Sequence, residues 1–247
     1  MIEITSTLGP FLRSAMAAAE KVGFAKTVAL TRTAKRTATE FLPSEVRRVF
    51  DRPTPFTQAA FYWRPATVKR DNFEVGIKDQ ATRGTPASRY LAPEVFGGPR
   101  SQKRSERAFA NYAPAHIRRA FGNRGYWVPG PGAPRDAYGN VRGSFVVKVL
   151  SALKAQHDPL QNQTARSGAR KRRKGADQFF VIDPKGGKAP GIWTRRGGQA
   201  IPVFLFIHAP TYRKRFDFFG AGMSYAEKQF IVELERAFSE GFGRTKR

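Results

Sequence analysis

The chain of 247 residues contains no cysteine, which excludes disulfide bonds and thiolate metal sites. It also lacks any run of about 18 apolar residues, so the sequence predicts no membrane-spanning helix. The first ten residues show no positively charged segment followed by a long apolar run, and we therefore expect no signal peptide and no membrane partner. A chain without thiols is compatible with a reducing cytosol and with an exported particle.

Acidic residues are few, since 19 Asp and Glu stand against 44 Lys and Arg and the formal net charge is +25. Such an excess predicts an anionic partner, either nucleic acid or an acidic protein surface. Hydrophobic residues make up 40% of the chain, and 21 of them are Phe, so the sequence has enough apolar material for a core. The length allows one large domain or two small ones.

Hydrophobic periodicity predicts an α+β fold in which an antiparallel β-sheet packs with several α-helices. Helices are expected over the first forty residues, ending at Leu42-Pro43, and then over 45–50, 103–121 with a break near Pro114, 141–155, and 224–240. Strands are expected at 59–67, 72–78, 179–182, 191–194 and 201–207. Turns are expected at 126–132, at Gly186-Gly187 and at Gly197-Gly198.

Apolar residues at helical spacing predict the buried faces of the first and last helices. In the first helix they are Phe24, Val28, Leu30, Ala34, Ala38 and Phe41. In the last helix they are Phe230, Leu234 and Phe238, supported by Ile231 and Ala237. Ser224 and Glu227 have the spacing of a capping box, which predicts that the last helix begins there.

Two segments, 80–102 and 126–140, are rich in Gly and Pro and poor in periodic apolar residues. A short helix near 87–91 is the only element expected in the first of them. Long loops in compact domains are uncommon and often functional. We therefore expect both segments to be extended arms that contact neighbouring subunits.

The segment 161–178 has no large apolar residue and carries Arg166 and a basic run. We expect it to be a mobile or partner-ordered loop, inserted into one domain that spans 1–247. Two interpretations of the run stay open: a solvated loop, or salt-sensitive and sequence-independent binding of polyanions or an acidic partner. The residues of the run are Arg170, Lys171, Arg172, Arg173 and Lys174.

Aromatic residues in the first predicted hairpin allow a second mode of nucleic-acid contact. Phe61, Tyr62 and Trp63 could stack on bases, as aromatic side chains do in single-strand binders. Their position in an amphipathic strand favours core packing instead.

The sequence shows no recognisable catalytic set. The three histidines match no metal-binding spacing, the Gly pairs lack the frame of a phosphate loop, and no G-x-S-x-G motif occurs. A nuclease would need clustered carboxylates for a divalent metal, and no tight pair is present. We therefore predict no enzymatic activity, no cofactor and no metal site. The residues considered are His116, His157, His208, Glu74, Asp79, Asp177 and Asp183.

Several segments together resemble a known family. They are 49–57 (VFDRPTPFT), 83–91 (RGTPASRYL) with Pro93, 97–100 (GGPR) and 136–140 (DAYGN). These segments resemble phage proteins of the minor tail protein Z, or tail-completion, type. The resemblance covers roughly residues 20 to 155, with a weaker likeness over 202–238, and the basic segment from Arg166 to Lys174 matches no part of the family pattern.

The resemblance implies a structural protein of a tailed bacteriophage virion, without enzymatic activity, in the neck or tail. Such proteins are head–tail joining or tail-completion subunits that form cyclic homo-oligomeric rings at the head-tail connector. The implied partners are further copies of the chain, portal or tail proteins, and the DNA in the channel; the implied origin is the host bacterial cytoplasm. The residues also leave open a basic nucleic-acid-binding protein and, with less support, a nuclease.

Overall fold

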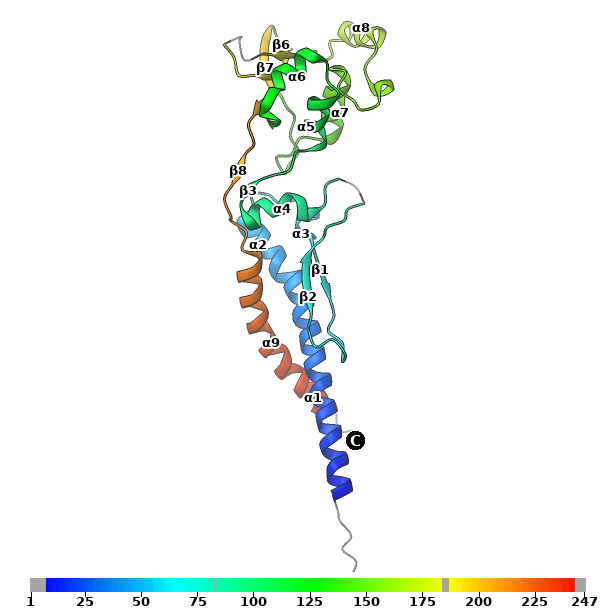
Figure 1. Cartoon of the computed structure of the whole chain (residues 1–247), viewed down its shortest axis with the longest axis vertical. Helices are drawn as coiled ribbons and strands as arrows, with labels where there is room; N and C mark the ends of the chain where they lie inside the picture. Colours follow the sequence, from blue (N-terminus) through cyan, green and yellow to red (C-terminus); the bar gives the residue numbers. More distant parts are fainter. Residues whose placement is uncertain (1–7, 83, 184–186, 243–247) are drawn as a thin grey trace, which may run out of the picture. The chain divides into compact units, whose positions relative to one another are not determined.

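The structure, a computed structural model, describes residues 8–82, 84–183 and 187–242 (Figure 1). Its contacts group the chain into two compact units, which are described separately below. Unit 1 combines residues 1–91 with 214–247, and unit 2 comprises residues 92–213. Helices and antiparallel strands are both present, which confirms the predicted α+β class. That one domain spans the whole chain stays a prediction.

Unit 1 is built on two long helices that pack along each other, α1 (Leu8–Arg36) and α9 (Phe218–Phe242) (Figure 1). A π-helical turn, η1 (Thr37–Phe41), joins α1 to α2 (Leu42–Val49). After α3 (Pro55–Gln58), the predicted hairpin forms from β1 (Phe61–Arg64) and β2 (Glu74–Ile77), paired antiparallel. Helix α4 (Ala87–Phe96) follows, and its first half belongs to unit 1.

The predicted end of the first helix at Leu42-Pro43 is wrong. The backbone N–H of Leu42 donates to the carbonyl of Thr37, which is five residues earlier, so the chain makes one wide turn and continues as α2. Pro43 then lies in the first turn of α2, where a missing N–H costs no helical hydrogen bond. The π-helical turn therefore allows the helix to continue through Pro43, which would otherwise end it.

The contact between α1 and α9 uses small residues on both helices. Ala25 and Ala29 pack with Ala237, and Val28, Phe230, Leu234 and Phe238 complete this cluster. Phe24 and Ile231, which were predicted to be buried, are 66% and 60% exposed. Each is the neighbour of a residue on the contact face and is therefore turned about 100° away from it.

The predicted capping box of the last helix is also wrong. Helix α9 begins at Phe218, so that Ser224 and Glu227 lie inside it. Asp217 takes the capping role instead, because its Oδ1 accepts the N–H of Gly220 at 3.2 Å.

Unit 2 contains a four-stranded antiparallel sheet in the order β4-β7-β6-β5. The strands are β4 (Tyr126–Pro129), β5 (Phe179–Ile182), β6 (Gly191–Arg196) and β7 (Gln199–Ile207). A separate pair joins β3 (Gly98–Pro99) to β8 (Thr211–Tyr212). The helices are α5 (Arg104–Asn111), α6 (Ala115–Phe121), α7 (Gly143–Ala152) and α8 (Ala165–Arg173), with the short 3₁₀ turns η2 (Gly122–Arg124) and η3 (Pro159–Gln161).

The core of unit 2 lies between the sheet and its helices, and aromatic residues dominate it. The rings of Trp127 on β4 and Phe204 on β7 stack with centroids 4.0 Å apart. Phe109 and Phe121 bring α5 and α6 against Phe206 of β7. This core also contains Val149 and Leu150, and it therefore fixes α7.

The predicted hairpin turn at Gly197-Gly198 is confirmed. Both residues have positive φ (56° and 78°), as a two-residue turn between β6 and β7 requires. For the turn at Gly186-Gly187, Gly186 lies outside the described residues. The turn predicted at 126–132 is wrong at its start, because residues 126–129 form β4. Pro129 is compatible with a strand there, since β4 is the edge of the sheet and Pro129 its last residue.

The two predicted arms are more ordered than expected. The first contains α4, whose Ala87 and Leu91 are buried against Ala60. The second contains β4 and then a tight turn, in which Asp136 Oδ1 accepts the N–H groups of Tyr138 and Asn140, each at 2.9 Å. Apolar residues that lack helical or strand periodicity therefore still find core positions here. Contact between these segments and other subunits stays a prediction.

Candidate functional site

The basic run lies on helix α8 and its C-terminal cap, so the expectation of a loop at 161–178 is wrong. Helix α8 begins after Thr164, whose Oγ1 accepts the N–H of Ser167 at 3.2 Å. It ends at Arg173, and Gly175, two residues later, has a φ of +71°. There the N–H of Ala176 donates to the carbonyl of Lys171 at 3.0 Å, and the N–H of Gly175 to that of Arg172 at 2.9 Å. These two bonds form a Schellman cap.

Sequence signals for this helix exist at both of its ends. A Thr followed three residues later by Ser marks an N-terminal cap, and a Gly after a basic run marks a C-terminal cap. Four of the basic side chains lie in the last turn, where cations interact favourably with the helix dipole. The expectation of a loop rested on missing apolar residues, and α8 has no buried residue at all.

Helix α8 presents its cations on two sides. Arg166, Arg170 and Arg173 follow one another at helical spacing and form an exposed outer stripe. Lys171 and Arg172 lie outside this stripe, and both line a cavity beside α7. Among the described residues, no carboxylate forms an ion pair with any cation of α8 or with Lys174. The helix therefore carries uncompensated positive charge.

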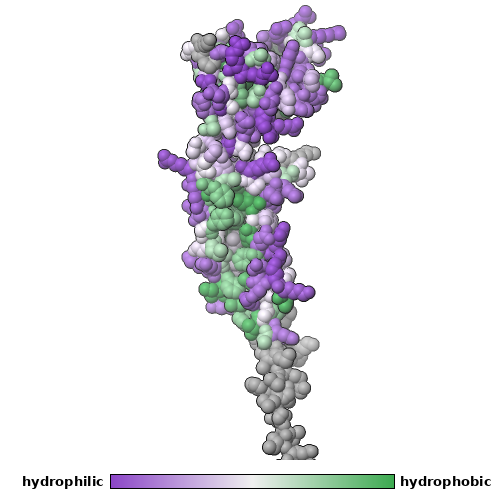
Figure 2. Space-filling view, in the orientation of Figure 1, coloured by the Kyte–Doolittle hydropathy of each residue, from purple (hydrophilic) through white to green (hydrophobic). Residues whose placement is uncertain are grey.

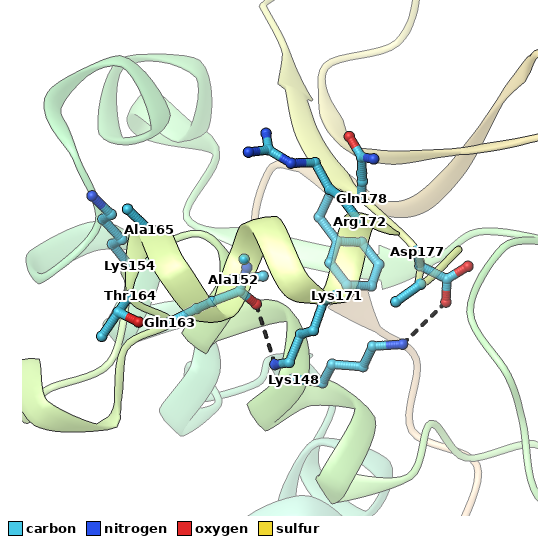
Figure 3. Close-up of a pocket in the computed structure, with 13 residues that line it drawn as sticks. Lys148, Ala152, Lys154, Gln163, Thr164, Ala165, Lys171, Arg172, Asp177 and Gln178 are labelled. Carbon is cyan, nitrogen blue, oxygen red and sulfur yellow. Dashed lines mark hydrogen bonds and ion pairs between the residues drawn. The ribbon is translucent and has the colours of Figure 1, made fainter. Parts of the chain in front are cut away.

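The cavity between α7 and α8 is open to solvent and has a volume of about 260 Å³ (Figure 3). Three lysines and one arginine line it together with one carboxylate. The cations are Lys148 from α7, Lys154 from the residues after α7, and Lys171 and Arg172 from α8. Gln163, Thr164 and Gln178 add neutral hydrogen-bonding groups.

Hydrogen bonds attach the segment between α7 and α8 to the end of α7. This attachment holds α8 in place. The N–H of Gln163 donates to the carbonyl of Ser151 at 3.0 Å, and the Ser151 hydroxyl donates to the carbonyl of Gln161 at 2.7 Å. Lys171 Nζ donates to Gln163 Oε1 at 3.2 Å, as the dashed line in Figure 3 shows. Gln163 therefore connects the end of α7 with a cation of α8.

Of the described residues that line the cavity, Asp177 alone carries a carboxylate, and two cations share it. Lys148 Nζ lies 3.2 Å and Arg196 Nε 3.3 Å from its carboxylate oxygens. Burial alone would raise the pKa of Asp177, but these two ion pairs outweigh it and hold the pKa below its usual value. Asp177 is thus ionised at neutral pH. Lys148 and Arg196 compensate its negative charge, and Lys154, Lys171 and Arg172 do not pair with it.

The structure does not bring the candidate catalytic residues together. Glu74 and Asp79 belong to unit 1, whereas Asp177 and Asp183 belong to unit 2. Glu74 accepts hydrogen bonds from the Tyr62 hydroxyl at 2.5 Å and from Arg64 at 3.0 Å, so its carboxylate is used within the hairpin. Across residues 8–82, 84–183 and 187–242, no group of three or more His, Asp or Glu side chains could hold a metal ion, and this includes His116, His157 and His208.

Among the aromatic residues considered for base stacking, Phe61 is buried. Its ring packs against Phe216 and Phe218 of unit 1. Tyr62 and Trp63 are half-buried, and the hydroxyl of Tyr62 is bound to Glu74. Core packing of Phe61, the expected alternative to stacking, is confirmed.

Unit 1 carries an exposed apolar surface on α9. Phe219 and Met223 are 59% and 62% exposed, and both line an open groove of about 480 Å³. Figure 2 shows the apolar side chains gathered over this helix. The groove is completed by apolar residues of α1, α2 and the hairpin, among them Leu30, Leu42, Phe73 and Val75.

Comparison with known proteins yields no relative, since the chain matches no family model, no curated protein and no solved structure. No helix in the described part of the chain is long and apolar enough to cross a membrane. The two surfaces described above, the basic one on α8 and the apolar one on α9, are therefore the features from which a function can be inferred.

Proposed function

We propose that this chain is a structural subunit of a tailed bacteriophage virion, a head–tail joining or tail-completion protein that assembles as a homo-oligomeric ring around the DNA channel. The proposal combines the resemblance of its turn and loop motifs to tail-completion proteins with one structural observation. That observation is the apolar groove of α9, with Phe219 and Met223 exposed in a chain of net charge +25.

Exposed apolar patches on a charged protein mark surfaces that become buried in an assembly. Burying a side chain such as Phe or Met contributes about 1.5–3 kcal/mol. A ring needs a heterologous interface, in which one surface of a subunit meets a different surface of the next. The groove of α9 supplies one such surface. The positive charge suits acidic portal or tail proteins, or the DNA that passes through the channel.

Electron microscopy of purified particles tests this proposal. The chain is tagged after Arg247 in the phage that encodes it, and the tag is located with gold-labelled antibody. We expect label at the head–tail junction, with a ring of density whose symmetry gives the number of subunits. Particles that carry no label, with the tagged chain left in the lysate, would contradict the proposal.

Nucleic-acid binding is a second candidate function, which the unpaired cations of α8 favour specifically. It predicts that the isolated chain binds DNA with an affinity that falls steeply as salt rises. This outcome is independent of the particle experiment, because a virion subunit need not bind DNA when free. A nuclease gains no support, since its candidate carboxylates are divided between the two units.

A further inference from the structure

We infer that the cavity between α7 and α8 is a binding site for a phosphate of a nucleic-acid backbone. The site deepens the second candidate function and rests on it, and it does not depend on the virion role. Four cationic residues from three segments line one open cavity: Lys148, Lys154, Lys171 and Arg172. The cavity thus differs from the outer stripe of α8, which is a convex row of arginines.

The chemistry of the lining suits a phosphate. A guanidinium such as that of Arg172 can donate two parallel hydrogen bonds to phosphate oxygens, and ammonium groups add point charges. Gln163 and Gln178 offer amide groups at the same cavity. Among the described residues that line the cavity, Asp177 alone is acidic, and Lys148 and Arg196 compensate it. Lys154, Lys171 and Arg172 are therefore the cations of the lining that no carboxylate of the described residues compensates.

The backbone of Lys154 gives a second and independent observation. Its φ is +56°, a left-handed conformation that non-glycine residues rarely adopt. The N–H of Ala155 donates to the carbonyl of Leu150 at 2.8 Å, and that of Lys154 to the carbonyl of Ser151 at 3.2 Å. Lys154 thus occupies the position of a Schellman cap that glycine prefers. A lysine there is strained, and the strain is explained if its ammonium group is needed in the cavity.

A nucleic acid fits this surface better than an acidic protein. Protein interfaces have apolar centres rich in aromatic residues and Met and poor in Lys, whereas nucleic-acid interfaces are polar and strongly positive. Helix α8 has no large apolar residue, and three of the four cations of the cavity are lysines. The outer stripe, Arg166, Arg170 and Arg173, extends the positive surface beyond the cavity for neighbouring phosphates.

Fluorescence anisotropy with a labelled DNA duplex of about 20 base pairs and the full chain tests the inference. Lys154→Gly and Arg172→Gln each remove one cation from the cavity. Arg166→Gln and Arg170→Gln each remove one cation from the outer stripe and serve as matched controls. We expect about a tenfold or larger loss of affinity for each cavity variant and about a twofold to threefold loss for each control, since the cavity is lined by cations from three segments, whereas the outer stripe is one row on a single helix.

Lys154→Gly also separates binding from folding. Glycine relieves the strain at φ +56°, so we expect this variant to melt at the same temperature as the wild type or higher, while it binds DNA less well. Inorganic phosphate, added at constant ionic strength in place of chloride, should displace the duplex from the wild type and much less from Arg172→Gln.

The outcomes distinguish the inference from the function on which it rests. If the wild type does not bind the duplex at low salt, both nucleic-acid binding and the phosphate site are wrong. If it binds but the cavity variants lose no more affinity than the outer controls, binding is diffuse and only the site is wrong. If poly-glutamate displaces the duplex at lower charge concentration than unlabelled DNA does, the cavity is an acidic-protein site instead.

Discussion

Arg100, which is partly buried, and Glu106, which is fully buried, form an ion pair in unit 2 that is joined by two hydrogen bonds. Arg100 Nη1 donates to Oε2 of Glu106 at 2.8 Å, and Nη2 donates to Oε1 at 2.6 Å. The same carboxylate accepts the backbone N–H of Lys103 at 2.6 Å and that of Trp127 at 3.1 Å. Glu106 therefore connects the start of α5 with strand β4.

Replacing Glu106 by alanine should destabilise the protein by about 3–5 kcal/mol, because the partly buried Arg100 would lose its counter-ion and two backbone N–H groups would lose their acceptor. Urea unfolding followed by circular dichroism measures this loss. Asp51→Ala, which removes an exposed ion pair with Arg52, is the control and should cost less than about 1 kcal/mol. Equal losses of stability from the two substitutions would show that the Arg100–Glu106 pair stabilises the protein no more than an exposed ion pair does.

The glycine that ends α8 allows a test of the basic helix without any change of charge. A Cβ at Gly175 would meet no atom within 4 Å, so the cost of Gly175→Ala comes from its φ of +71° alone and should be about 1 kcal/mol. A nine-residue helix without buried residues depends on its caps. We expect faster amide hydrogen exchange over 165–174 and weaker binding of a DNA duplex.

Gly23→Ala is the matched control for this substitution. Gly23 lies inside α1, has negative φ and meets no atom within 4 Å, so alanine there should stabilise the helix by about 0.5–1 kcal/mol. Exchange over 165–174 and DNA binding should not change in this variant. A Gly175→Ala protein that exchanges and binds as the wild type does would contradict the role of the cap.

The sequence predicted elements where local chemistry and core packing agree. The hairpin at Gly197-Gly198 is such a case, since both glycines are needed for positive φ and the strands on either side are apolar. The break near Pro114 is another, because Pro114 stands between α5 and α6 as the residue before the second helix. In both cases few other residue types could take the place of the glycine or the proline.

Predictions that depended on a single sequence signal were wrong. Missing apolar residues predicted a loop for the segment that contains α8, although Thr164 and Gly175 mark its two ends. Pro43 predicted the end of the first helix, but a π-helical turn before it allows the helix to continue. The periodicity of apolar residues does not reveal such a turn. The cavity itself could not be predicted. Lys148 and Lys154 line the same cavity as Lys171 and Arg172 because the intervening segment folds back on α7, where Gln163 N–H donates to the carbonyl of Ser151.

Acid should destabilise the protein partly through Asp177. Its ion pairs with Lys148 and Arg196 hold its pKa in the folded chain below the usual value of about 3.9 for an unfolded chain. The folded state therefore binds the proton less well than the unfolded state does. The stabilisation is complete above the unfolded pKa and is lost as the pH falls through the folded pKa.

Urea midpoints between pH 7 and pH 2.5 measure this effect. The wild type should lose stability below about pH 4, and Asp177→Asn, which is less stable at pH 7, should lose less over the same range. The pKa of Glu240 is lowered as well, mainly by its hydrogen bond from Arg32, so some acid sensitivity will remain in the variant. If the two pH profiles run parallel, Asp177 does not contribute through its charge.

The apolar groove of α9 should control self-association. Phe219→Ser and Met223→Ser replace exposed apolar side chains, and we expect each to weaken the assembly of the chain by about tenfold or more, which corresponds to about 1.4 kcal/mol per interface. Sedimentation velocity over a range of concentrations measures the association of the purified chain. Because both side chains are largely exposed in the monomer, the melting temperature at low concentration should change little.

Val68→Ser provides the control for the groove variants. Val68 is 84% exposed in the connection between β1 and β2 and does not line the groove, so its loss removes exposed apolar area without touching the proposed interface. The proposed virion role extends this test, because it predicts how the same three variants affect assembly when they are introduced into the phage that it implies. Head–tail joining should fail with Phe219→Ser and Met223→Ser and proceed with Val68→Ser, since a ring closes only if every interface forms. Normal particles from both groove variants would show that α9 is not the surface through which subunits meet.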